Sequence, residues 1–158
     1  MELSDTYLRS IKLLREEIDS FDQYPFSLPI FRELDILEFH PQVTFIIGEN
    51  GTGKSTLLEA VAIAWGFNPE GGTRNFTFST RSSHSQLHEK IRLIRGAKKP
   101  KDGFFLRAES FYNLATQIDE LGVGGYYGGK SLHEQSHGEA FFATFMNRFK
   151  GNGLYILD

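Results

Sequence analysis

The sequence contains no cysteine, which excludes disulfide bonds and metal sites built from thiolates. It also lacks an apolar run of the roughly 20 residues that a membrane span needs. Charged residues interrupt the N-terminal stretch, which excludes a signal peptide. An excess of positive charge is missing too. At a net charge of −3, the chain as a whole has no electrostatic attraction for nucleic acid or an anionic membrane. We expect a cytoplasmic protein.

The composition is that of an ordinary globular chain, with 40% hydrophobic and 23% charged residues. A length of 158 residues fits a single domain over residues 1–158. Phenylalanine is abundant at 15 residues, which predicts an aromatic core. The alternation of apolar runs and helix formers predicts an α/β fold. The predicted strands are 43–47, 104–108 and 154–157, the predicted helices are 55–65, 110–121 and 136–149, and a hairpin is predicted over 76–94.

A glycine-rich loop lies between the first of these strands and the first helix. Residues 43–47 are β-branched and aromatic without polar alternation, which is typical of a strand buried on both faces. Gly48, Gly53, Lys54 and Ser55 then match the phosphate-loop pattern G-x-x-x-x-G-K-[ST]. Because a strand precedes the pattern and a helix follows it, the context that this motif requires is present. The sequence therefore predicts a P-loop.

A P-loop predicts binding of ATP together with Mg²⁺. Glycines let backbone N–H groups converge on phosphate oxygens, and the N-terminus of the following helix favours negative charge. Lys54 is expected to reach the β- and γ-phosphates, and the Ser55 hydroxyl is expected to hold Mg²⁺. The predicted ATP-binding residues are Glu49, Asn50, Gly51, Thr52, Gly53, Lys54, Ser55 and Thr56.

The segment from Ile47 to Thr56 resembles the Walker A motif of ABC-type P-loop ATPases, including the AAA-annotated, RecF/SMC-like branch. Two later segments extend the resemblance over residues 36–158. Leu154–Asp158 is similar to the Walker B strand, and Gln135–Glu139 stands where the family has its signature motif. The resemblance implies a P-loop NTPase fold with a mostly parallel core sheet. An antiparallel hairpin subdomain and a small helical, glycine-rich insert over 110–135 would accompany that sheet.

The resemblance also implies roles for individual residues. Asp158 would hold Mg²⁺ together with Ser55, and Glu109 would stand at the family's Q-loop position. A homodimer would form around ATP, with the signature of one chain reaching the γ-phosphate bound by the other. Ser136 and Gly138 match the signature, whereas Gln135, His137 and Glu139 depart from it. An ordinary helix-capping box is therefore the alternative. The residues of this in-trans signature are Ser136, His137, Gly138 and Glu139.

In the family, a glutamate that positions the attacking water follows the Walker B aspartate. The sequence ends at Asp158, so the resemblance implies a chain truncated at that residue, with weak or absent ATP hydrolysis. The later strands of the core sheet would be missing, leaving an unpaired apolar edge. A nucleotide-binding or interaction module without catalysis is the alternative function.

Three further features of the sequence suggest other binding roles: a zinc-site pattern, two aromatic residues and a basic cluster. His133, Glu134 and His137 match H-E-x-x-H, the pattern of zinc hydrolases, but glycines close to it interrupt the helix that it requires. Tyr24 or Phe26 would suit stacking on adenine, although we favour a core or loop aromatic at both positions. A basic cluster raises the possibility of nucleic-acid contacts, but the negative net charge and the lack of interleaved aromatics favour a solvated surface. The cluster comprises Lys90, Arg92, Arg95, Lys98, Lys99 and Lys101.

Overall fold

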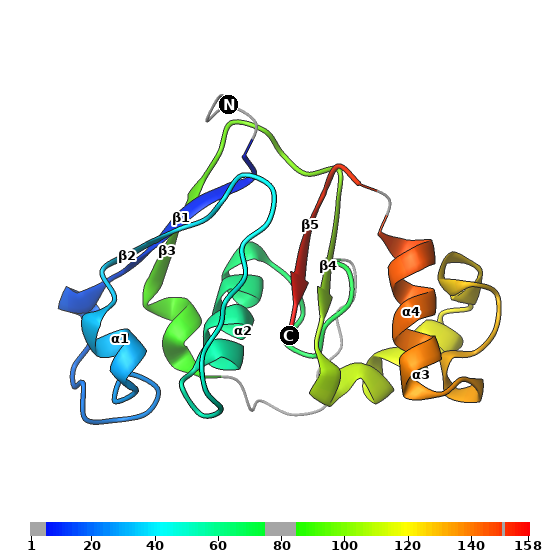
Figure 1. The fold of residues 1–158 in the computed structure, drawn as a ribbon, viewed down its shortest axis with the longest axis horizontal. Coiled ribbons are helices and arrows are strands. Elements are labelled where there is room, and N and C mark those ends of the chain that lie inside the picture. Colours follow the sequence, from blue (N-terminus) through cyan, green and yellow to red (C-terminus); the bar gives the residue numbers. More distant parts are fainter. Residues whose placement is uncertain (1–5, 75–84, 150) are drawn as a thin grey trace.

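The structure is a computed structural model that describes residues 6–74, 85–149 and 151–158. Its described part contains two separate sheets (Figure 1). One is antiparallel with the strand order β2-β1-β3, and the other is a parallel pair of β4 and β5. The strands are β1 (Leu8–Leu13), β2 (Ile36–Glu38), β3 (Ile91–Arg95), β4 (Asp102–Leu106) and β5 (Gly153–Leu157).

Helices lie on both sides of the parallel pair. In Figure 1, α2 stands between the two sheets, whereas α3 and α4 lie beyond β4. Short 3₁₀ helices at 15–17, 86–89, 108–110, 124–127 and 132–134 connect these elements. The α-helices are α1 (Pro29–Glu33), α2 (Lys54–Trp65), α3 (Phe111–Glu120) and α4 (His137–Arg148).

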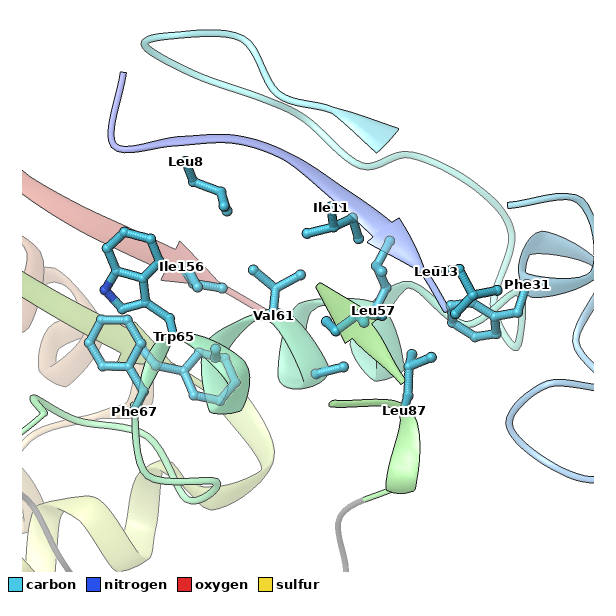
Figure 2. Close-up of a cluster of buried hydrophobic side chains, with 14 of the residues drawn as sticks. Leu8, Ile11, Leu13, Phe31, Leu57, Val61, Trp65, Phe67, Leu87 and Ile156 are labelled. Carbon is cyan, nitrogen blue, oxygen red and sulfur yellow. The ribbon is translucent and has the colours of Figure 1, made fainter. Parts of the chain in front are cut away.

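The larger hydrophobic core surrounds α2, as Figure 2 shows. Leu57, Val61 and Trp65 of α2 are buried there against Ile11 of β1 and Ile156 of β5. Full burial of such an apolar side chain contributes roughly 1.5–3 kcal/mol. This core therefore fixes the helix that begins at the P-loop against both sheets.

A second core lies on the opposite face of β4. Phe104 and Phe105 are both fully buried, but Phe105 belongs to the core around α2 while Phe104 packs with α3 and α4. Successive side chains of a strand point to opposite faces, so β4 joins the two cores. Leu114 and Ile118 of α3 are fully buried in this second core, and Ala140 of α4 is almost so. The predicted small helical insert over 110–135 includes α3, and its standing as a separate unit remains a prediction.

The prediction of a mostly parallel core sheet is wrong for the described residues. Three of their five strands form the antiparallel sheet, and only β4 and β5 are parallel. Part of the second arm of the predicted hairpin over 76–94 differs from the prediction: it is a 3₁₀ helix over 86–89 followed by β3, which pairs with β1. The pairing of the two arms with each other stays a prediction. The first arm falls within residues 75–84, outside the described residues.

The predicted strand over 43–47 is likewise absent. This segment has no regular structure, and Val43, Phe45 and Ile47 are 59%, 85% and 90% exposed. A strand buried on both faces needs neighbouring strands and covering layers. In the described part of the chain β5 pairs only with β4, and no strand pairs with 43–47.

The other predicted elements are confirmed within one or two residues. The strands at 104–108 and 154–157 correspond to β4 and β5, and the helices at 55–65, 110–121 and 136–149 correspond to α2, α3 and α4. Gly66 ends α2 in the left-handed conformation with φ of 111°, as a C-terminal glycine does. None of the described helices combines the length and the hydropathy that a membrane crossing requires.

Candidate phosphate-binding site

The P-loop begins α2 and is shaped by its glycines. Gly53 is the N-cap of the helix, with φ of 101°, a left-handed conformation that favours glycine. A Cβ at this position would lie 3.0 Å from Leu28 Cδ1 and 3.2 Å from Phe31 Cε2, so the loop packs closely on α1 and its preceding turn. Gly51 has φ of 80°, and a Cβ there would meet no atom within 4 Å, so the tip of the loop borders open space.

Lys54 closes the loop on itself. Its ammonium group donates hydrogen bonds to the carbonyl oxygens of Gly48 at 2.9 Å and Glu49 at 2.7 Å. The Thr52 hydroxyl donates to the same Glu49 carbonyl at 2.8 Å. The positive charge is therefore held inside the turn rather than extended into solvent.

The first turn of α2 supplies free donors beside that charge. Within the described part of the chain, the backbone N–H groups of Gly53, Lys54 and Ser55 have no hydrogen-bond acceptor. Unpaired N–H groups at the start of a helix and the positive end of its dipole attract anions. The ammonium and the three donors together fit a phosphate group, and the Ser55 hydroxyl would be available to a metal ion bound with it.

A hollow of about 300 Å³ lies over this turn. The structure brings six of the predicted ATP-binding residues together there, and it adds Tyr24 and Leu28. The Tyr24 hydroxyl hydrogen-bonds to Thr56 Oγ1 at 3.0 Å, while the Tyr24 side chain remains 65% exposed. Phe26, the other aromatic considered for adenine, is buried in the core. The predicted residues lining the hollow are Asn50, Gly51, Gly53, Lys54, Ser55 and Thr56.

A buried ion pair links the P-loop helix to the end of β4, and the sequence patterns did not predict it. Arg107 Nη1 lies 2.6 Å from Glu59 Oε2, with side-chain exposures of 18% and 7%. The same guanidinium reaches Glu109 Oε2 at 3.2 Å, so the candidate Q-loop residue is joined to α2 through Arg107. The one sequence signal was Glu59 itself, an acidic residue within a mostly apolar helix.

Asp158 directly follows β5. Its N–H donates to Leu106 O at 2.9 Å, and its carbonyl accepts from Ala108 N at 3.3 Å, which continues the pairing with the β4 side. Asp158 is half-buried and does not line the hollow over the P-loop. Its predicted role at Mg²⁺ therefore remains a prediction, as does the role of Glu109.

The signature-like segment forms a capping box at the start of α4. Ser136 Oγ accepts from Glu139 N at 3.3 Å, and Glu139 Oε2 accepts from Ser136 N at 2.9 Å. The Ser136 hydroxyl also donates to this carboxylate at 2.7 Å. These hydrogen bonds lower the pKa of Glu139, with the side-chain bond from Ser136 as the largest cause. Ser136 and Glu139 are exposed at the start of α4, and α4 lies on the other side of β4 from α2 (Figure 1).

The zinc-hydrolase pattern does not form its site. His133 lies in the 3₁₀ helix over 132–134, Gln135 is extended, and α4 begins only at His137, so no continuous helix carries both histidines. His133 Nε2 instead hydrogen-bonds to Thr116 Oγ1 at 3.0 Å. Among the side chains that the structure describes, no group of three or more metal-ligating residues comes together.

A second ion pair fastens α4 to the start of β4. Arg148 donates two hydrogen bonds to the Asp102 carboxylate, at 2.6 and 2.7 Å, and Tyr155 Oη donates a third at 3.0 Å. Desolvation raises the pKa of Asp102, but these bonds and one from the Gly103 N–H outweigh it, so the pKa lies below its ordinary value. This cluster supports the second core rather than the P-loop.

Comparison with protein families gives one result that bears on this geometry. A family model described as an AAA domain matches residues 17–118. The match includes the P-loop, Glu59 and Arg107, and it ends before Ser136 and Asp158. No curated protein and no solved structure matches the chain.

Proposed function

The chain belongs to the AAA domain family, and we propose that it binds ATP with Mg²⁺ in the hollow over its P-loop. The observation that carries this proposal is the position of Lys54 beside three unpaired N–H groups at the start of α2. One buried helix presents both the point charge and the donors to the same anion. Tyr24 lines the same hollow and would lie near the base.

A finer assignment goes beyond the family match. We propose an ABC-type protein of the RecF/SMC-like branch, in which Ser55 and Asp158 serve Mg²⁺ and two copies close around ATP. The position of Ser136 supports this dimer, because it is an exposed residue at the start of α4, and α4 lies on the other side of β4 from the helix that begins at the P-loop. Such a residue would meet the nucleotide of a second copy.

A thermal shift of the purified chain with Mg·ATP tests the binding. A ligand at a hundred times its dissociation constant stabilises the folded state by about 2.7 kcal/mol. For a domain of this size that corresponds to a rise in Tm of roughly 5–11 °C. Lys54→Ala should abolish the rise, whereas the control Lys130→Ala, at an exposed lysine beyond α3, should keep it.

A cooperative melt that ATP does not move would contradict the proposal, as would an equal shift in the Lys54→Ala variant. Sedimentation with and without Mg·ATP tests the dimer separately. Dimerisation that depends on ATP and weakens in Ser136→Ala would support the in-trans role. A chain that binds ATP and stays monomeric would leave a nucleotide-binding module as the function.

A further inference from the structure

The face of the antiparallel sheet that points away from the core carries unpaired positive charges. Ile11 and Leu13 of β1 are buried in the core, so the alternation along the strand places Lys12 on the opposite face. Lys12 lies directly opposite Arg92 of β3, and directly opposed residues project from the same face. Arg9 is exposed, and because a register shift between Leu8 and Ser10 interrupts the alternation there, it lines the same hollow as Ser10.

One described carboxylate, that of Glu38, shares this face and lines the hollow beside Arg9, but no ion pair joins it to these cations. Among the described residues, Arg9, Lys12 and Arg92 take part in no ion pair. Two like charges in directly opposed positions of a sheet destabilise it, so the pairing of Lys12 with Arg92 has no structural benefit. A bound anion would turn this repulsion into attraction. Arg95 is not part of this group, because its guanidinium stacks over Trp65 at 4.4 Å.

A hollow of about 220 Å³ opens on the same face, next to Arg9. Ser10, Glu38 and Phe39 are among the residues that line it. Thr6 also lines it, at 3% exposure, and within the described part of the chain its hydroxyl has no hydrogen-bond partner. A buried hydroxyl without a partner costs stability unless a ligand or water satisfies it.

We propose that this face binds single-stranded nucleic acid, with phosphates on Arg9, Lys12 and Arg92 and one base in the hollow. Phosphate contacts supply most of the affinity of such proteins, and an aromatic ring gives each base a surface to stack on. Phe39 is half-buried against the core around α2 but also lines the hollow, where its accessible part offers that ring. Thr6 offers a hydroxyl to the edge of the base. Only an unpaired base can leave its strand and enter a hollow, which favours a single strand over a duplex.

The distribution of charge supports binding of nucleic acid through local contacts with this face rather than through long-range attraction by the whole chain. The whole chain carries −3, whereas the loop that follows β3 adds two more exposed cations, Lys99 and Lys101. Positive charge is thus gathered at one face and the adjacent loop of an otherwise acidic molecule. Phe39 follows β2, far in sequence from the basic cluster around Arg92, so the sequence alone showed no aromatic among the cations.

Fluorescence anisotropy of a labelled 20-nucleotide oligo(dT), measured between 50 and 200 mM KCl, tests the proposal. Three phosphate contacts on a single strand predict a slope of log K against log salt of about −2, or roughly 20-fold weaker binding over this range. Arg92→Glu should weaken binding at least tenfold and make the slope shallower. Lys130→Glu, an equal charge reversal at an exposed residue elsewhere, should leave both unchanged.

Thr6→Val separates the hollow from the charges. If the Thr6 hydroxyl is only a structural defect, valine keeps or raises Tm and leaves the affinity for the oligonucleotide unchanged. If the hydroxyl contacts a base, valine keeps or raises Tm and weakens binding severalfold. Unchanged affinity would overturn the placement of a base in the hollow.

Three results would overturn the proposed face. One is the absence of salt-dependent binding, another is equal loss in Arg92→Glu and Lys130→Glu, and the third is tighter binding of a 20-base-pair duplex or of phosphatidylserine vesicles than of oligo(dT). Lys54→Ala should bind oligo(dT) as the native chain does. The result is therefore independent of whether the P-loop binds ATP.

Discussion

Replacing Arg107 with methionine tests whether a buried ion pair fastens the P-loop helix to the end of β4. The change removes the guanidinium but keeps a side chain of similar length. Among the residues that the structure describes, it leaves the Glu59 carboxylate, 7% exposed, with the Ser85 N–H at 3.3 Å as its remaining hydrogen-bond donor. Removing one member of a buried pair costs about 3–5 kcal/mol. We expect the lower end, about 3 kcal/mol, because Arg107 is 18% exposed and water can approach.

The two single variants should differ. Glu59→Leu leaves Arg107 with Glu109 and with the Pro69 carbonyl at 3.2 Å, so we expect a smaller loss of about 1–2 kcal/mol. The double variant, Glu59→Leu with Arg107→Met, replaces the pair by apolar side chains. It should therefore be more stable than Arg107→Met alone.

Urea unfolding followed by tryptophan fluorescence measures these differences, since Trp65 is the only tryptophan and lies in α2. A loss of 3 kcal/mol should also lower Tm by about 6–12 °C in a domain of this size. Arg32→Met is the matched control, because it breaks an exposed pair with Asp22 and should cost less than about 1 kcal/mol. An Arg107→Met variant no less stable than this control, or a double variant whose losses simply add, would refute the reasoning.

Three further predictions concern other parts of the fold. Desolvation raises the pKa of Asp102 but the bonds from Arg148 lower it more, so its stabilisation is present above its ordinary pKa of 3.8 and is lost as pH falls below it. Melts at pH 7, 5 and 3 should therefore show a smaller drop below pH 4 in Asp102→Asn than in the native chain, and equal drops would contradict this. Ser136→Ala should remove the α4 cap and lower the free energy of unfolding by about 1 kcal/mol in urea titrations, with Ser136→Gly losing less. Gly53→Ala should cost at least about 1–2 kcal/mol through its positive φ alone, and a variant as stable as the native chain in the same titration would argue against this loop geometry.

Sequence patterns predicted the elements that are fixed by interactions between residues close in sequence. The start of α2 follows from Gly53, its end follows from Gly66, and the capping box of α4 follows from Ser136 and Glu139. Each of these features is fixed by hydrogen bonds and backbone angles within a few residues. The turn of the P-loop belongs to the same class, because the loop and its lysine are consecutive in sequence.

Features that depend on distant partners were not predictable in this way. An apolar run such as 43–47 becomes a buried strand only if other strands lie beside it, and its own residues do not determine that. β3 pairs with β1 across about 80 residues of sequence, which no hairpin signal encodes. The pair of Arg107 with Glu59, 48 positions apart, could be recognised only once both ends were placed.

The two ends of the P-loop are held very differently. Downstream, α2 is fixed by the core and by Arg107. Upstream, only Ile46 of the segment 43–47 packs against that core, and the segment pairs with no described strand. Fixing the backbone of one residue costs about 1–2 kcal/mol, so any freedom that this segment lost when a phosphate bound would consume part of the binding free energy. A strand that paired with 43–47 would fix the backbone of this segment before nucleotide binds. Nucleotide would then bind more tightly. By linkage, nucleotide would strengthen the pairing of that strand by the same factor.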